Sequence, residues 1–426
     1  MKLKWTVSVF VTFGLSRLAF AQEGGVPKPA PVEVMFADGL HFRAPAGDFD
    51  IMVGGYVGLH YREVPHRPAD NVRTSPDTFF VRQARPEISG FVDRDFDFRL
   101  QVDFPTGTAS ATTGTVQDAY VGWRYWPELS FRLGQFKEPF GQEQTTPDRL
   151  IDFDERSDFD RLVPGRDLGA MVYGSLWSGL LSYEAGAFNG QGRAVVDATD
   201  DKEVTGRLRS LPFVGSGPEF LLRRLRLGLA GTAGTVTKSS INGLDLTSTG
   251  LNVFFLDATT GQLDGPRTRI GAELTWAYGP FELRAEELRR TDSVDVGGAQ
   301  NRKIHSTGGK VSATWLLTGE EKPIEARVVP LHPFDPRTGT WGALELAARA
   351  ARLKIDDDVF DLGIASVATN SNGLTTLAFG ANWYLTRGIR ISPNVFWEVF
   401  DDPILFADGR SDRHFFGGIL RFQLEF

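Results

Sequence analysis

Arginine is the residue type of this chain with the clearest chemical potential. The 426 residues include 36 arginines but only 10 lysines, although the net charge is −8. A guanidinium group stays charged at any physiological pH, and its planar fork of donors matches the oxygens of carboxylate and phosphate. Arginines lined up along one surface would therefore suit contact with small oxyanions.

The spacing of the arginines adds to this. Twelve of them share one side of segments in which apolar and polar residues alternate: Arg99, Arg124, Arg132, Arg207, Arg209, Arg224, Arg226, Arg269, Arg284, Arg349, Arg390 and Arg421. The same side carries eleven acids: Asp97, Asp103, Asp118, Glu184, Glu203, Glu273, Glu282, Glu286, Glu345, Glu398 and Glu425. Twelve arginines against eleven acids leave this side of the strands with almost no net charge. Two interpretations stay open, a path for anions and a salt-bridged lining that only rigidifies a wall.

Alternation with a period of two predicts β-strands. Between Phe96 and Phe104 every second residue is apolar and the others are polar, and Phe416 to Phe426 repeats the pattern. We expect sixteen strands, at about 49–61, 79–91, 95–104, 116–126, 129–136, 168–177, 180–189, 203–213, 223–235, 267–278, 281–290, 304–317, 341–355, 373–385, 389–399 and 414–426. The strand at 341–355 is ambiguous, because LELAARAARLK also has helical propensity.

The connections between these strands are of two kinds. Short turns, such as Pro127-Glu128 and Gly279-Pro280, alternate with long polar loops. The long loops are expected at 62–78, 105–115, 137–167, 190–202, 236–266, 291–303, 356–372 and 400–413. This layout is typical of an all-β fold, a transmembrane antiparallel β-barrel of about 16 strands. The gap at 318–340 is long where a short turn is due, and the 236–266 loop has room for a short hairpin.

The ends of the chain fit export to an outer membrane. Residues 1–21 read as a signal peptide, with Lys2 and Lys4 before an apolar run and Ala19-Phe20-Ala21 at the cleavage site. A Pro/Gly-rich lead-in over 22–48 is expected to be flexible, and the barrel to occupy 49–426. Trp and Tyr near strand ends suit membrane interfaces. A soluble β-sandwich or β-helix is the alternative, but its apolar faces would favour branched aliphatic residues.

The loop at 137–167 is expected to narrow the lumen. Thirty-one residues without a strand pattern is long for a connection. Its apolar residues are too many for a free surface loop: Phe140, Leu150, Ile151, Phe153, Phe159, Leu162 and Val163. A loop folded back into the barrel would bury them. Its acids, such as Glu143 and Asp152, could also pair as the general acid and base of a glycosidase, which is the enzymatic alternative.

Several segments resemble the phosphate-selective porin O and P family. They are DGLHFRAPAGDFDIMVGGYVGLHYR from Asp38, FFVRQARPEISG from Phe79, DAYVGWRYWPELSFRLGQFKEPFGQE from Asp118 with the following DFDERSDFD, and GALELAARAARLKIDD from Gly342. The GQFKEPFG element is the most specific of them. The resemblance implies a sixteen-stranded barrel, usually a homotrimer, in which the third loop constricts the pore and basic residues guide oxyanions.

The resemblance also implies site residues. Lys137 matches the family's lysine at the start of the constricting loop, and Asp118 matches the acid of its DAY segment. Arg82 and Arg85 fall in an arginine-rich strand. Parity turns Arg85 toward the lumen and Arg82 outward, unless a bulge intervenes. With Arg99, Arg124 and Arg132, these are the candidate anion-binding residues. The phosphate-specific members of the family are lysine-rich, whereas this chain has ten lysines, so a general or sugar-type diffusion porin is the alternative.

Composition excludes other classes. The chain has no cysteine, so it forms no disulfide and no thiolate metal site. An acidic chain with scattered basic residues is a poor nucleic-acid binder. No cofactor or metal is expected, because the six histidines sit in no motif and the acidic runs lack the glycine and spacing of a calcium loop. The expected partners are small anions such as phosphate, outer-membrane lipid and further copies of the chain.

Overall fold

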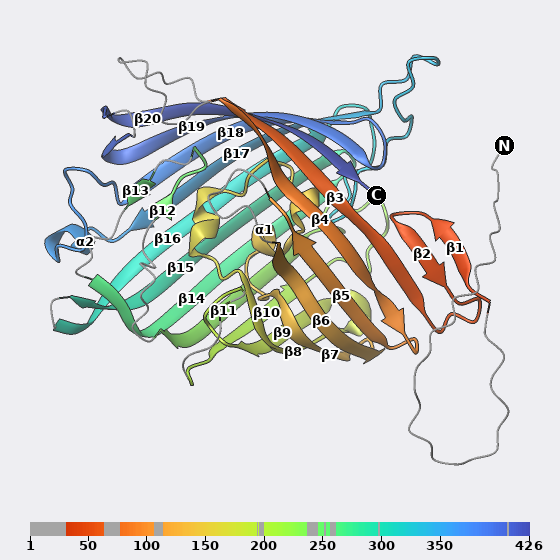
Figure 1. Ribbon diagram of the computed structural model, residues 1–426, viewed down its shortest axis with the longest axis horizontal. Helices are drawn as coiled ribbons and strands as arrows, with labels where there is room; N and C mark the ends of the chain where they lie inside the picture. The colour runs from red at the N-terminus through yellow and green to blue at the C-terminus, as the bar shows by residue number, and fades with distance from the viewer. Residues whose placement is uncertain are drawn as a thin grey trace, which may run out of the picture.

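Sixteen antiparallel strands close into a barrel in the computed structural model (Figure 1). The structure describes residues 31–63, 77–105, 114–193, 195, 200–236, 246–250, 253–255, 261–296, 299–406 and 409–426. The barrel strands are β3 (Asp50–Glu63), β4 (Thr78–Val92), β5 (Phe96–Asp103), β6 (Thr115–Trp126), β7 (Leu129–Lys137), β8 (Arg166–Leu176), β9 (Leu181–Phe188), β10 (Glu203–Ser210), β11 (Arg226–Val236), β14 (Gly261–Tyr278), β15 (Phe281–Val296), β16 (Ala299–Leu316), β17 (Ala343–Ile355), β18 (Gly373–Tyr384), β19 (Ile389–Leu405) and β20 (Ser411–Glu425). Each pairs with its neighbours in the chain, and β20 pairs with β3 to close the ring.

All sixteen expected strands are present, including the ambiguous one, which is β17. The two faces of each strand differ as the alternation predicts. In β20, Leu420, Phe422 and Leu424 are exposed on the outside, whereas Arg421 and Gln423 are buried in the lumen. The outer face is apolar and the inner face polar around the barrel, which is the reverse of a soluble β-protein.

Two predicted long loops are wrong. At 400–413, β19 continues to Leu405 and β20 starts at Ser411. Residues 291–303 do not form a long polar loop, because β15 continues to Val296 and β16 starts at Ala299. At this end of the hairpin the residues on both faces are polar, as in Thr291 to Ser293. The two strands remain paired there although apolar residues no longer alternate with polar ones. The sequence pattern therefore ends earlier than the strands.

The N-terminal lead-in contains an ordered hairpin. Strands β1 (Glu33–Phe36) and β2 (Leu40–Arg43) pair with each other, and β2 pairs with the start of β3. The Asp50 carboxylate anchors it by accepting hydrogen bonds from Arg43 and His41. The prediction that the whole 22–48 segment is flexible is therefore wrong for residues 33–43. The signal peptide at 1–21 and the rest of the lead-in up to residue 30 lie outside the described residues, so the division of the chain stays a prediction.

Two of the long connections have structure of their own. The 236–266 loop contains the expected hairpin, formed by β12 (Leu246–Thr247) and β13 (Val253–Phe255), and both Phe254 and Phe255 are buried. The 356–372 loop contains α2 (Asp358–Asp361). The loops predicted at 62–78, 105–115, 190–202, 236–266 and 400–413 lie partly outside the described residues. In the described part of the chain, no helix has the length and apolar character needed to cross a membrane.

The 137–167 loop folds into the lumen as expected, and short helical turns shape it (Figure 1). They are α1 (Gln142–Thr145), η1 (Asp148–Leu150) and η2 (Asp158–Leu162), and a further turn, η3 (Trp177–Gly179), joins β8 to β9. Phe140, Phe153 and Phe159 are buried. Two glycines in the wall make room for them. A Cβ at Gly308 would lie 2.8 Å from the Cβ of Phe159, and one at Gly271 would lie 3.0 Å from the ring of Phe140.

Phe159→Ala should weaken the packing of the loop against the barrel wall. Removing a fully buried phenylalanine leaves a cavity against β16, and such truncations lower the free energy of unfolding by about 3–5 kcal/mol. Urea titration of the protein folded into lipid vesicles measures the change. Phe379→Ala is the control, because Phe379 is 58% exposed on the outer wall and its truncation leaves no internal cavity. Equal losses in the two variants would show that the loop contributes nothing to stability at this point.

Candidate functional site

Two cavities remain between the folded loop and the wall formed by β3 to β9. The larger, of about 760 Å³, opens toward the long loops and is called the loop-side cavity here. The smaller, of about 180 Å³, lies toward the short turns and is called the turn-side cavity. Both are lined by Arg85, Asp148 and Arg166. These three residues therefore lie at the junction of the two cavities.

Basic residues outnumber acidic ones in both cavities. The loop-side cavity is lined by seven basic residues, Arg62, Arg82, Arg85, Arg156, Arg161, Arg166 and Arg193, and five acids, Asp103, Asp148, Asp154, Glu155 and Asp160. The turn-side cavity is lined by six basic residues, Arg85, Arg99, Arg132, Lys137, Arg149 and Arg166, and three acids, Asp118, Asp148 and Glu184. The residues that face each cavity leave an excess of two positive charges in the first and three in the second. Behind the turn-side lining, Glu87, Asp97 and Glu425 pair with three of its arginines. The positive excess is therefore a property of the side chains that face the cavities.

The junction of the cavities is an ion-pair network that links wall and loop. Arg85 on β4 donates to Asp103 Oδ2 at 2.7 Å and to Asp148 of the loop. Asp148 is also paired with Arg156. Burial raises the pKa of Asp148, but the guanidinium groups of Arg156 and Arg85 outweigh it and hold that pKa well below its usual range. The carboxylate therefore stays charged and neutralises part of the arginine charge at the junction of the cavities.

Arg82 reaches the lumen through a bulge. Gly58 pairs with Gln83 while Leu59 pairs with Val81, so Arg82 is the extra residue of β4. Its guanidinium donates to both carboxylate oxygens of Glu155 in the loop, at 2.8 and 2.9 Å. The outward orientation that strict parity assigns to Arg82 does not occur, because the bulge shifts the alternation by one residue.

Three further candidates lie together in the turn-side cavity. Asp118 accepts from Arg166 Nε at 2.8 Å, and its other oxygen lies 3.9 Å from Arg99 Nε. Arg99 also donates to Glu87. The guanidinium carbon of Arg132 stacks over the ring of Tyr120 at 4.2 Å, and the nearest carboxylate, Asp97, is 4.0 Å away. Arg132 is therefore held mainly by aromatic faces and keeps donors for a solute.

Lys137 sits at the start of the loop, as expected, but its side chain serves the loop. Its ammonium donates to the carbonyl oxygens of Gln144 at 2.5 Å and Thr146 at 2.9 Å. Lys137 pairs in register with Arg166, so the two residues flank the point where the loop leaves the wall. Its contacts fit a positioning role more closely than direct contact with a solute. Arg124, in contrast, is exposed at the rim, with its guanidinium over Phe91 at 5.0 Å.

The remaining predicted lumen arginines are not free. Five of them donate to carbonyls, carboxylates or hydroxyls of the loop: Arg207, Arg269, Arg349, Arg390 and Arg421. Arg284 is buried against Glu282. The interpretation as a rigid, salt-bridged lining therefore describes this half of the barrel, and the open path runs along the other half.

The segment between β16 and β17 also enters the lumen, which the sequence indicated only by its length. Three of the predicted arginines, Arg209, Arg224 and Arg226, contact its acids Glu321 and Glu325. Its Lys322 is buried, and its ammonium donates to Asp152 of the loop at 2.6 Å and to Glu345 of β17 at 2.5 Å. Lys322 thus supports the loop from the turn side, and no motif pointed to it.

Two acids of the loop face the loop-side cavity with perturbed titration. Burial raises the pKa of Asp154 to about 7, although the guanidinium groups of Arg421 and Arg390 oppose the shift. Burial likewise raises the pKa of Asp160 to about 7, opposed by Arg156 and reinforced by Glu143. The charge of this cavity therefore changes near neutral pH.

Comparison with known proteins gives consistent matches. The family model described as phosphate-selective porin O and P matches residues 53–402. Porin O of Pseudomonas aeruginosa is 23% identical over 390 residues, which is 85% of this chain and 86% of that protein. The outer membrane channel DcaP of Acinetobacter baumannii has 13% identity and a TM-score of 0.58, covering 90% of this chain and 99% of that one. The anion-selective porin from Comamonas acidovorans has 12% identity and a TM-score of 0.55, covering 89% and 100%.

Lys137→Met should loosen the loop without disturbing the wall. The change leaves the buried carbonyl of Gln144 with a weaker set of donors, which costs about 1–3 kcal/mol. Limited trypsin digestion of the folded protein reports it, since Arg149, Arg156 and Arg161 lie in the loop. Arg132→Met is the matched control on the same strand, because Arg132 contacts Asp97, Tyr120, Phe136 and Tyr173, which all belong to the wall. Faster cleavage is expected for Lys137→Met alone, and identical digestion of both variants would contradict it.

Proposed function

The chain belongs to the phosphate-selective porin O and P family of channels in the outer membrane of Gram-negative bacteria, and from this premise we propose that it passes small oxyanions such as phosphate or polyphosphate by passive diffusion. The excess of basic residues in both cavities carries the proposal. A field of this sign raises the local concentration of anions and lowers that of cations. The fold match to an anion-selective porin is consistent with it.

Two guanidinium groups are the best candidates for direct contact with the solute. Arg161 lines the loop-side cavity, and its side chain has no carboxylate partner among the described residues. Arg132 lines the turn-side cavity and is held mainly by aromatic rings. An oxyanion can replace part of its hydration shell with these donors on either side of the junction. Arg85, Arg99 and Arg166 complete the path, and Asp118 orients the last two.

The neutralised junction supports a second candidate, a general or sugar-type diffusion porin. Arg85 and Arg166 at the junction of the cavities both contact carboxylates, those of Asp103, Asp148 and Asp118. If the charge at the junction is cancelled, the size of a solute determines whether it passes, and the charge of the two cavities only attracts anions to them. The two candidates differ in ion preference and in block by phosphate, which can be measured.

We also propose that the barrel works as a homotrimer surrounded by outer-membrane lipid. The family resemblance implies the trimer, and the outer wall of exposed Leu, Val and Phe side chains suits a lipid environment.

A planar bilayer recording tests the function. We expect a reversal potential that indicates anion preference in a KCl gradient, and a KCl conductance that falls when phosphate is added. Arg132→Gln together with Arg161→Gln should lower the anion-to-cation permeability ratio at least about fivefold, because each removed charge is worth about 1 kcal/mol at 4 Å even in water. Arg94→Gln is the control, since this exposed residue sits in the turn after β4 and pairs with Asp48 outside the lumen. Cation preference would refute the anion proposal, and anion preference without phosphate block would favour the general porin.

Anion preference should increase as the pH falls from 8 to 6. Asp154 and Asp160 are mostly ionised at pH 8 and mostly protonated at pH 6, because their pKa values are both about 7. Protonation raises the positive excess of the loop-side cavity from two to four. Reversal potentials recorded at both pH values measure the change. The Asp154→Asn, Asp160→Asn double variant should show high anion preference at both, and an unchanged pH response in that variant would assign the effect to other groups.

A further inference from the structure

The connection between β16 and β17 leaves the lumen halfway along its length. Val328 is still buried at the short-turn end of the lumen. Six residues later, the ring of Phe334 packs against that of Trp383, with the two centroids 5.5 Å apart. Trp383 belongs to the outer face of β18, because its neighbours Asn382 and Tyr384 are buried on the lumen side. The connection therefore crosses the rim of the barrel from the inside to the outside.

Beyond the rim the connection exposes large apolar side chains. Val329, Leu331 and Trp341 are each more than half exposed. Trp341 lies next to Trp383, whose indole N–H donates to the Trp341 carbonyl at 2.6 Å, and Phe334 contacts both rings. Apolar side chains of this size that gather on a surface mark a place where a protein meets a partner or a membrane.

The polar residues of this outer part lie at its tip. The backbone of Gly342 donates to the carbonyl of His332 at 3.1 Å, which closes residues 329–341 into a lobe, called the β16–β17 lobe here. At the tip, Asp335 forms a β-bridge with Thr340, and its carboxylate accepts from the backbone of Arg337 at 2.8 Å. The lobe is thus amphipathic, with apolar side chains at its base next to the barrel and polar residues at its tip.

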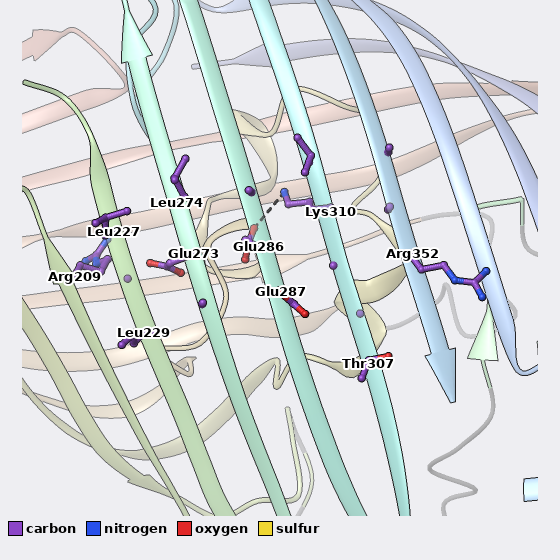
Figure 2. A pocket seen from close by; sticks show the side chains of 18 of the residues that line it. Arg209, Leu227, Leu229, Glu273, Leu274, Glu286, Glu287, Thr307, Lys310 and Arg352 are labelled. Atoms are coloured by element: carbon purple, nitrogen blue, oxygen red, sulfur yellow. Dashed lines mark ion pairs between the residues drawn. The ribbon is translucent and has the colours of Figure 1, made fainter. Parts of the chain in front are cut away.

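The barrel wall above the lobe is apolar. Figure 2 shows the outer wall over β14 to β17, where small and aliphatic side chains surround a hollow of about 980 Å³. On the part of the hollow toward the short turns, the outward side chains are Leu227, Leu274, Ala285, Val311 and Ala350. At the foot of this wall, Trp315 stacks on Phe281 with ring centroids 5.4 Å apart. Aromatic rings in this position form the girdle of a barrel at the membrane interface. The lobe therefore leaves the wall at the level of the lipid head groups.

We propose that the β16–β17 lobe anchors the rim of the barrel in the periplasmic leaflet of the outer membrane, with Leu331, Phe334 and Trp341 among the phospholipid head groups. The lobe continues the aromatic girdle of the wall and turns its apolar base to the side on which the wall meets lipid. Aromatic rings are stabilised at this depth, because their apolar faces leave water while polar edges stay hydrated.

The anchor also has a consequence inside the barrel. Lys322 and Glu325, which bind the folded loop and the wall from the turn side, precede the lobe by a few residues. Lipid outside the barrel and the support of the loop inside it are thereby joined through one short segment of chain. The proposal needs only the membrane position of the barrel and does not depend on the solute that passes through it.

Depth-dependent quenching tests the anchor, because the chain has no cysteine of its own. Leu331→Cys at the base of the lobe and Thr338→Cys at its tip are each labelled with a small fluorophore and folded into phosphatidylcholine vesicles. Phe379→Cys is the reference for lipid contact, since Phe379 is exposed on the outer face of β18. We expect a phospholipid with a nitroxide head group to quench the label at 331, and iodide, present on both sides of the membrane, to quench the label at 338.

Two other outcomes would overturn the proposal. Equal quenching by iodide at 331 and 338 would place the whole lobe in water, where it could only serve a periplasmic protein. A label at 331 that neither quencher reaches would place the lobe against another copy of the chain. Unboiled electrophoretic mobility checks that each labelled barrel is folded, and quenching of the Phe379→Cys label by a chain-labelled lipid checks its insertion.

Protease access to the inner half of the connection gives an independent test. Arg327 lies just before the lobe and pairs with Glu425 and Asp38. In lipid nanodiscs, which leave both rims accessible, Leu331→Asp should speed trypsin cleavage after Arg327 about tenfold, because one leucine returned to water costs an energy of this size. Thr338→Asp, at the polar tip, should leave the rate unchanged. Equal rates for wild type and Leu331→Asp would show that the lobe is not held by lipid.

Discussion

The architecture of the lumen depends on guanidinium groups of the wall that bind oxygens of the inward-folded loop. Five of these arginines hold one side of the loop: Arg207, Arg269, Arg349, Arg390 and Arg421. Two others, Arg82 and Arg85 of β4, contact the loop from the β3–β4 side of the barrel. A backbone inside a barrel has no ladder of its own, so its carbonyls need donors from elsewhere. Arginine supplies several donors per side chain and remains charged when buried. The arginine bias of the chain thus reflects support of the loop and, in the function proposed above, contact with a solute.

Separating these two roles changes the meaning of the charge count. Counted over the whole lining, twelve bases and eleven acids cancel. The folded loop, however, uses most of the arginines on its own side and leaves the open path to the wall of β3 to β9. Among the side chains that face the two cavities there, basic ones exceed acidic ones, because arginines share carboxylates: Arg85 and Arg156 share Asp148, and Arg62 and Arg82 share Glu155. A folded loop can in this way convert a neutral lining into a charged path by deciding which charges remain exposed.

The fold could be predicted almost completely from the sequence, because a barrel wall has one apolar and one polar face and the alternation records both. The lumen fold of the loop could be predicted from its apolar residues, which need burial. The position of the Arg82 side chain in the lumen could not be predicted without knowing of the bulge, because a bulge is not visible in an alternating sequence pattern. The supporting role of Lys322 and Lys137 could not be predicted, because it depends on carbonyls and carboxylates brought together from segments far apart in the chain. The strand extensions of β15 and β16 were missed where both faces became polar.

The seam of the barrel joins the two ends of the folded chain. Gly418 to Glu425 of β20 pair with β3, and the backbone of Phe426 exchanges hydrogen bonds with that of Gly55. The barrel strands between β3 and β20 find both partners among their neighbours in sequence, but β3 and β20 are paired across more than 350 positions of the chain. Contacts of such separation form slowly. The wall can grow hairpin by hairpin, yet the ring exists only when the last strand arrives, so until then β3 presents an open edge that another chain or an assembly factor can occupy.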